Sequence, residues 1–148
     1  MTSQLNVDTI VDKAGSGGTN VKIGNTSTYV SDGGSATQNT VQGLLKAWLN
    51  MDGSGTIAIT DSFNIGSITD IATGDYFVNL SNAMANSTWC VVGSSTPHVG
   101  QSNNVGVSFQ HENNPLTTTR CRPVTRRRDN NTDVDVEDIY LNMSGDLA

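Results

Sequence analysis

The chain has 148 residues and a net charge of -6, and only 15% of its residues are charged, whereas ordinary domains carry about 25%. A length near 150 residues predicts one domain and excludes a second catalytic domain. The low charge does not fit the composition of disordered chains, and the acidic balance argues against nucleic acid as a general partner.

Small residues dominate the composition, since Thr, Asn, Ser and Gly supply 64 of the 148 residues. They are weak helix formers and are frequent in turns, so the composition predicts an all-β protein. No stretch approaches the roughly 20 apolar residues of a membrane-spanning helix, and the N-terminus lacks the basic and then apolar order of a signal peptide. No membrane association is therefore expected.

Residues 1–36 differ from the rest of the chain. Leu5, Val7 and Val11 alternate with polar residues, which predicts a strand that is apolar mainly on one face. Glycine clusters then cut the segment into strands too short to fold alone. We expect an extended N-terminal arm that orders on a neighbouring subunit, with attachment or oligomer contacts at Leu5, Val7, Ile10 and Val11.

Residues 37–51 carry two overlapping patterns. An apolar stripe at helical spacing runs through Leu44, Leu45 and Trp48, while Ala47 and Met51 belong to an alternating, strand-like pattern. We expect a short helix at about residues 39–45 and then a strand. The apolar cluster is expected to pack in a core, and Leu44, Leu45 and Trp48 are expected to make contacts where the arm joins the domain.

Short strands follow at regular intervals from residue 56 onward. The expected ranges are 56–60, 62–70, 75–80, 88–93, 105–110, 119–126 and 133–143. Turn residues separate them every 8 to 12 positions, which is typical of an antiparallel sandwich. The sequence therefore predicts an antiparallel β-sandwich domain over residues 37–148.

Charge is concentrated near the C-terminal end. The basic residues of this segment are Arg120, Arg122, Arg126, Arg127 and Arg128, and the acidic residues that follow are Asp129, Asp133, Asp135, Glu137 and Asp138. Such an arginine run could bind phosphate groups. Charge pairing across a hairpin at residues 129–131, or across a subunit boundary, is the favoured interpretation.

No catalytic motif is present in the sequence. The two histidines, His98 and His111, lie in irregular polar stretches, where solvent exposure is favoured over a shared metal site. No nucleophile elbow and no phosphate-binding glycine loop occurs. We therefore expect a protein that is not an enzyme and that holds no cofactor and no metal. Cys90 and Cys121 fit neither a disulfide framework nor a zinc spacing and are expected as reduced thiols.

Short elements follow one another in a specific order between residues 45 and 95. They are KAW at 46–48, GSGT at 53–56, DSFN at 61–64, SITD at 67–70, TGDY at 73–76 and AM at 83–84. This order resembles that of bacteriophage tail-fibre-like proteins, particularly those of marine phages. The opening LNVDTIVDKAG is similar to an attachment or oligomerisation strand of such proteins, and the ending DVDVEDIYLNMSGD is similar to their closing strand.

The resemblance implies a structural protein of the virion, a tail fibre or tail-associated protein, that assembles as a homo-oligomer and contacts other virion proteins. By analogy with phage fibres, the resemblance implies a trimer. Two alternatives remain. One is a capsid decoration protein docked by the same arm. The other is a receptor-binding or carbohydrate-binding module for host attachment, in which polar loops at residues 94–104 and 111–118, with His98, would contact a host surface glycan.

Overall fold

The computed structural model describes residues 27–30, 37–40, 43–96, 105–109 and 116–148. It divides the chain into two compact units, residues 1–41 and residues 42–148, and each is described by itself below. Across the described residues the regular structure consists of strands alone. No helix in these ranges is long and apolar enough to cross a membrane. The predicted all-β class is confirmed.

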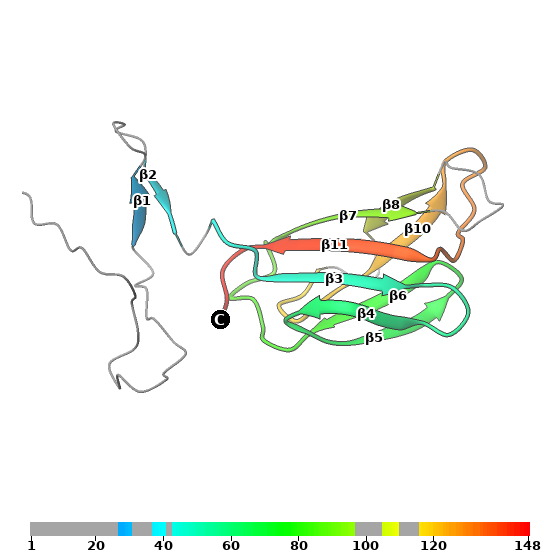
Figure 1. Cartoon of the computed structure of the whole chain (residues 1–148), viewed down its shortest axis with the longest axis horizontal. Helices are drawn as coiled ribbons and strands as arrows, with labels where there is room; N and C mark the ends of the chain where they lie inside the picture. The colour runs from blue at the N-terminus through cyan, green and yellow to red at the C-terminus, as the bar shows by residue number, and fades with distance from the viewer. Residues whose placement is uncertain (1–26, 31–36, 41–42, 97–104, 110–115) are drawn as a thin grey trace, which may run out of the picture. The chain divides into compact units, whose positions relative to one another are not determined.

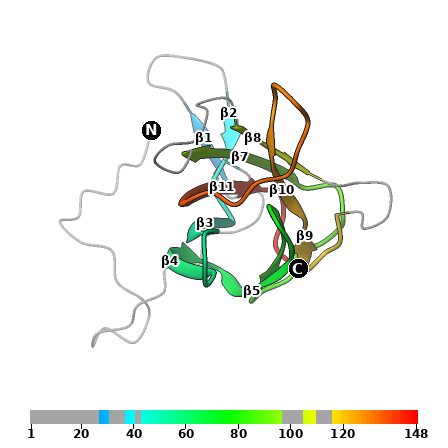
Figure 2. The same ribbon diagram turned by 90° about the vertical axis from the view of Figure 1, so that its right-hand side faces the viewer.

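The second unit is an antiparallel β-sandwich (Figures 1 and 2). Its strands are β3 (Ala47–Asp52), β4 (Ala58–Phe63), β5 (Ile65–Ala72), β6 (Asp75–Leu80), β7 (Cys90–Thr96), β8 (Val105–Phe109), β9 (Arg120–Cys121), β10 (Pro123–Arg127) and β11 (Asp138–Ser144). One sheet has the order β4-β3-β11-β7. The other has the order β5-β6-β10-β8, and β9 also pairs with β6. Figure 2 views the sandwich nearly along its strands, so the two sheets appear as facing layers.

The core lies between the two sheets and follows from the two-residue period of their strands. In β3, Ala47, Leu49 and Met51 are buried while the residues between them are only half-buried. In β11, every second residue from Ile139 onward is buried in the same way. Each large apolar side chain buried from water contributes about 1.5 to 3 kcal/mol, which is why this alternation determines the face that each strand turns inward.

Residues 62–70 do not form the single strand that the alternating pattern predicts. The chain leaves one sheet at Phe63 and enters the other at Ile65, and Asn64 between them has a positive φ of 59°. The Asn64 side chain donates to the Lys46 carbonyl and accepts from the Asn82 backbone N–H at 2.7 Å. Because an alternating pattern looks the same before and after such a crossing, the sequence period could not reveal it.

The last strand is shorter than predicted. It begins at Asp138 instead of residue 133, and residues 131–137 form a connection outside the strands, apart from an isolated bridge at Asp133. Val134 and Val136 in this connection are buried in the core. Their alternation with acidic residues resembles a strand because every second side chain points inward, although the backbone pairs with neither sheet as a strand.

The described part of the first unit is a two-stranded hairpin. Residues of β1 (Thr28–Val30) pair antiparallel with those of β2 (Thr37–Asn39). The described residues of the segment expected as a short helix, residues 39–40 and 43–45, contain no helix, and residues 41–42 lie outside the described ranges. The predicted attachment residues Leu5, Val7, Ile10 and Val11 also lie outside them, as do most residues of the two predicted contact loops.

Candidate functional site

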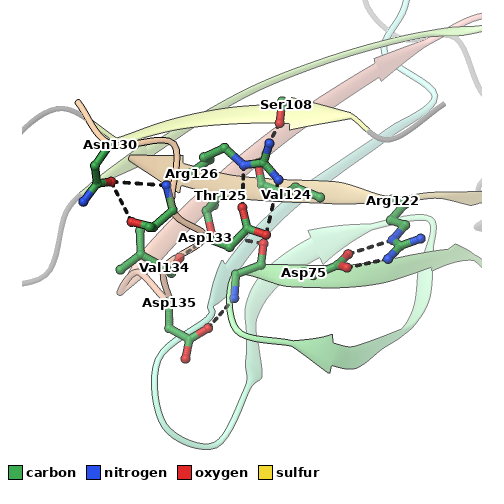
Figure 3. Close-up of polar contacts among 12 residues, drawn as sticks. Asp75, Ser108, Arg122, Val124, Thr125, Arg126, Asn130, Asp133, Val134 and Asp135 are labelled. Carbon is green, nitrogen blue, oxygen red and sulfur yellow. Dashed lines mark hydrogen bonds and ion pairs between the residues drawn. The ribbon is translucent and has the colours of Figure 1, made fainter. Parts of the chain in front are cut away.

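The arginine-rich segment runs from β9 through β10 into the turn that follows, and Arg122 and Arg126 in it form ion pairs (Figure 3). Arg126 donates two hydrogen bonds to Asp133 across the turn at residues 128–132, which agrees with the predicted pairing. Arg122 pairs with Asp75 of β6, a partner that the sequence did not suggest. These hydrogen bonds raise the pKa of both guanidinium groups above their ordinary value.

A stacked arrangement accompanies the second pair. The guanidinium carbons of Arg120 and Arg122 lie 4.0 Å and 5.5 Å from the centre of the Phe77 ring. Arginine over an aromatic face is stabilised by the ring quadrupole. Together with the Asp75 carboxylate, which is nearly buried, these contacts attach β9 to β6. Arg120 and Arg122 therefore have structural contacts inside one sheet.

Asp135 has a different role from the predicted salt bridge. Its Oδ1 accepts from the Gly74 backbone N–H at 2.6 Å (Figure 3). It also lies 3.0 Å from the Tyr76 hydroxyl. The same hydroxyl lies 2.9 Å from the Gly53 carbonyl oxygen. The TGDY element thus links the β5–β6 turn, the β3 end and the connection before β11. The pKa of Tyr76 is raised above its ordinary value, mainly by burial and to a smaller extent by the negative charge of Asp135.

The end of the arginine run borders a shallow pocket of about 350 Å³. It is lined by Gly106, Val107, Ser108, Arg126, Arg127, Arg128 and Asn131. The guanidinium of Arg128 lies against Gly106, since an added Cβ there would stand 2.6 Å from its Nε. Arg127 and Arg128 lie at this pocket together with Arg126, which is paired with Asp133. Glu137 lies half-buried in the connection before β11.

The predicted junction residues differ in exposure. Leu44 and Leu45 precede β3 and are 58% and 49% exposed, so they are available for contact with other chains. Trp48 lies in β3 but on the side of the sheet opposite to Ala47 and Leu49, and it is half-buried. The expectation that this tryptophan packs within the core is wrong, because the strand period places it outside. Trp89 is the tryptophan that packs in the core.

A surface that sequence reasoning missed is the outer side of the β4-β3-β11-β7 sheet, called here the aromatic face. Two rows of registered residues cross it. The first is Phe63, Trp48, Asn142 and Val92, and the second is Asp61, Asn50, Tyr140 and Ser94. Phe63, Val92 and Tyr140 are 53%, 57% and 39% exposed. The alternation of Trp48 with Leu49, and of Tyr140 with Leu141, was the signal that could have identified it.

The two cysteine thiols differ in their exposure to solvent. Cys90 in β7 is exposed and Cys121 in β9 is buried, and both are free. Burial raises the pKa of the Cys121 thiol to about 12. Among the described residues, no three His, Cys, Asp or Glu side chains are grouped so as to hold a metal ion. His98 and His111 lie outside the described ranges.

The geometry therefore offers binding surfaces on the outside of a closed sandwich: the paired arginine segment, the exposed junction leucines and the aromatic face. Comparison of the chain with protein-family models, with curated proteins and with solved structures gave no match.

Proposed function

We propose that the protein is a non-enzymatic structural component of a bacteriophage virion, a tail fibre or a tail-associated protein, which assembles as a symmetric oligomer through its N-terminal arm. The observation that carries this proposal is the division of the chain into a closed sandwich and a separate segment. All described residues of the core cluster come from position 47 or later, and the first 41 residues form their own unit.

The exposed hairpin in the first unit supports an assembly role. Tyr29 and Val30 of β1 are 63% and 54% exposed. An isolated two-stranded hairpin is marginally stable in water, so a segment of this kind gains most from packing on a neighbour. A symmetric oligomer supplies such a neighbour to every copy. Leu44 and Leu45, which precede β3 in the second unit, are further exposed apolar residues.

The sequence resemblance to phage tail-fibre-like proteins supports the same proposal. Elements that carry it have framework roles in this fold: Asn64 of DSFN makes the crossing between sheets, and Gly74 and Tyr76 of TGDY join three connections. A similar order of elements in another chain would therefore preserve the same sandwich. Assembly as a trimer comes from this resemblance alone.

Deletion of residues 1–41 tests the proposal. The sandwich should keep a cooperative thermal transition, because its core is built from later residues, while sedimentation should show monomers in place of the oligomer formed by the full chain. The shortened protein should also fail to enter phage particles. Tyr29→Ser with Val30→Ser is the milder variant and should weaken assembly without altering the thermal transition. A full chain that is monomeric, or a shortened chain that assembles normally, would contradict the proposal.

The copy number on an intact particle separates the tail from the capsid. Quantitative mass spectrometry of purified particles should find a few copies or a few trimers for a tail fibre. Hundreds of copies would instead indicate a capsid decoration protein attached by the same arm.

A further inference from the structure

The aromatic face combines ring surfaces and polar side chains in neighbouring positions. Phe63 lies directly opposite Trp48, and Asn142 lies opposite Trp48 on the other side. Tyr140 lies one row further along, beside Asn50. Directly opposite residues have Cβ atoms about 5 Å apart, and diagonal neighbours such as Trp48 and Tyr140 about 7 to 8 Å. The rings of Phe63, Trp48 and Tyr140 are therefore successive neighbours across the sheet, and the side chains of Asn50 and Asn142 lie beside Trp48 and Tyr140.

A shallow depression lies beside the Tyr140 ring. It has a volume of about 240 Å³ and is lined by Val92, Gly93, Ser94, Tyr140 and Asn142. Pyranose rings with equatorial hydroxyl groups, such as glucose and N-acetylglucosamine, present an apolar face of C–H groups and a rim of hydroxyl groups. The apolar face stacks on aromatic rings, and the rim reaches the hydroxyl and amide groups beside them.

The polar groups of this face favour a hydroxyl-rich ligand over an apolar protein segment. Asn142 and Asp61 lie on the outer side of the sheet in the two registered rows. Covering them with an apolar strand would leave polar atoms of both side chains unpaired, at about 1 to 3 kcal/mol for each buried group. A saccharide brings donors and acceptors to the same positions.

Charge further restricts the ligand. The charged side chains that the register places on this face are Asp61 and, at one end, Asp52 and Asp138. The arginines of the C-terminal segment belong to the other sheet and its following turn. An anionic polysaccharide would be repelled by these carboxylates, whereas an uncharged one would not.

We propose that the aromatic face binds uncharged oligosaccharides of equatorial pyranoses, with Trp48 and Tyr140 as stacking residues and Asn142 as a hydrogen-bonding residue. This site differs from the polar loops and His98 that the sequence suggested for glycan contact. It does not depend on the arm, so its failure and the failure of the proposed assembly role would be observed in different experiments.

Titration followed by nuclear magnetic resonance tests the proposal on the full chain. The protein has two tryptophans, so a ¹⁵N-labelled sample gives two indole N–H signals. Trp89 is buried and donates its indole N–H to the Thr117 carbonyl, which makes its signal an internal reference. Trp48→Phe assigns the other signal. Cellohexaose, chitohexaose and mannohexaose are the uncharged probes, and a heparin hexasaccharide is the anionic counterpart.

At least one uncharged probe should shift the Trp48 signal in a saturable manner and leave the Trp89 signal in place, while heparin should shift neither. Tyr140→Ala should raise the Kd by about threefold to tenfold, the loss expected for one aromatic contact. Tyr29→Ala is the matched control, because it removes an exposed tyrosine from a different unit, and it should leave the Kd unchanged. The unchanged Trp89 signal verifies that each variant is folded.

Three results would overturn the proposal. The first is the absence of a Trp48 shift with every uncharged probe, or a shift with heparin alone. The second is a Kd that Tyr140→Ala does not change. The third is a Trp48 signal that moves with protein concentration before any sugar is added, because this would identify the aromatic face as a contact between copies of the chain.

Discussion

The buried hydroxyl of Tyr76 offers the sharpest test of the sandwich. Tyr76 is fully buried, and its hydroxyl lies 2.9 Å from the Gly53 carbonyl oxygen and 3.0 Å from Oδ1 of Asp135. Tyr76→Phe removes the hydroxyl and keeps the ring. The hydroxyl has one proton, so it donates to the Gly53 carbonyl or to the Asp135 carboxylate, and the variant leaves that acceptor without its donor in a place that water reaches poorly.

The expected loss follows from these contacts. A hydrogen bond to a charged group contributes about 1.5 to 3 kcal/mol, so Tyr76→Phe should lower the free energy of unfolding by that amount. For a domain of roughly 100 residues this corresponds to a fall in Tm of about 6 to 12 °C. Urea titration and differential scanning calorimetry measure the two quantities. Asp135→Asn alone and combined with Tyr76→Phe completes a double-mutant cycle, which should give a coupling of about 1 kcal/mol.

Tyr140→Phe is the matched control, because it removes a tyrosine hydroxyl from the exposed aromatic face. It should change the free energy of unfolding by less than about 0.5 kcal/mol. A Tyr76→Phe variant as stable as Tyr140→Phe, or a double-mutant cycle without coupling, would refute the assigned hydrogen bonds.

The same pair predicts a pH effect. The pKa of Tyr76 is raised by burial and by the charge of Asp135, whereas a tyrosine in the unfolded chain ionises near pH 10. Above about pH 10 the unfolded state therefore binds fewer protons than the folded state, so stability falls as the pH rises. Tyr76→Phe lacks this titration. The difference in stability between wild type and variant should shrink between about pH 9 and pH 11, and a constant difference would contradict the assignment.

Three further predictions concern the glycines, the inner ion pair and the thiols. Gly74→Ala should cost more than about 2 kcal/mol in a urea titration, because Gly74 has a φ of 67° and an added Cβ would lie 2.6 Å from a backbone oxygen. Gly55→Ala, at a similar φ of 58° but in open space, should cost only about 1 to 2 kcal/mol, and equal losses would contradict the packing at Gly74. Arg122→Ala should cost about 1.5 to 3 kcal/mol, because it leaves a nearly buried carboxylate without its charged partner, and an unchanged urea midpoint would argue against that pair. In mass spectrometry after iodoacetamide treatment, Cys90 should be alkylated while Cys121 should react only after unfolding, and equal labelling of both would contradict the burial of Cys121.

The strand content from residue 47 onward could be predicted because it depends on local chemistry. The alternation of Ala47, Leu49 and Met51 determines a strand that buries one of its two sides. The turn at Thr73 and Gly74 ends β5, and β6, which follows the turn, pairs with β5. Composition predicted the all-β class, whereas the short helix expected at about residues 39–45 is absent from the described residues of that segment. Such patterns survive folding because burial of alternating side chains and the backbone angles of turn residues are decided within a few positions of the chain.

The candidate surfaces depended on contacts between distant segments. The sequence suggested that Trp48 packs in a core, since its own neighbours are apolar, but the side that it faces is set by which residues of β11 and β4 lie opposite. Tyr140, far away in the sequence, joins it on the same face only through that register. Likewise, Arg122 met Asp75 instead of a nearby acidic residue, because β9 pairs with β6.

By itself, then, the sequence determined an all-β domain, its turns and a segment of different character before it. The tertiary structure decided where the chain crosses between sheets, which carboxylate each arginine meets and which aromatic rings remain outside. Local patterns specify the direction of each side chain relative to its own strand. Only the pairing of strands within each sheet specifies which side chains from distant parts of the chain become neighbours and so form a common surface.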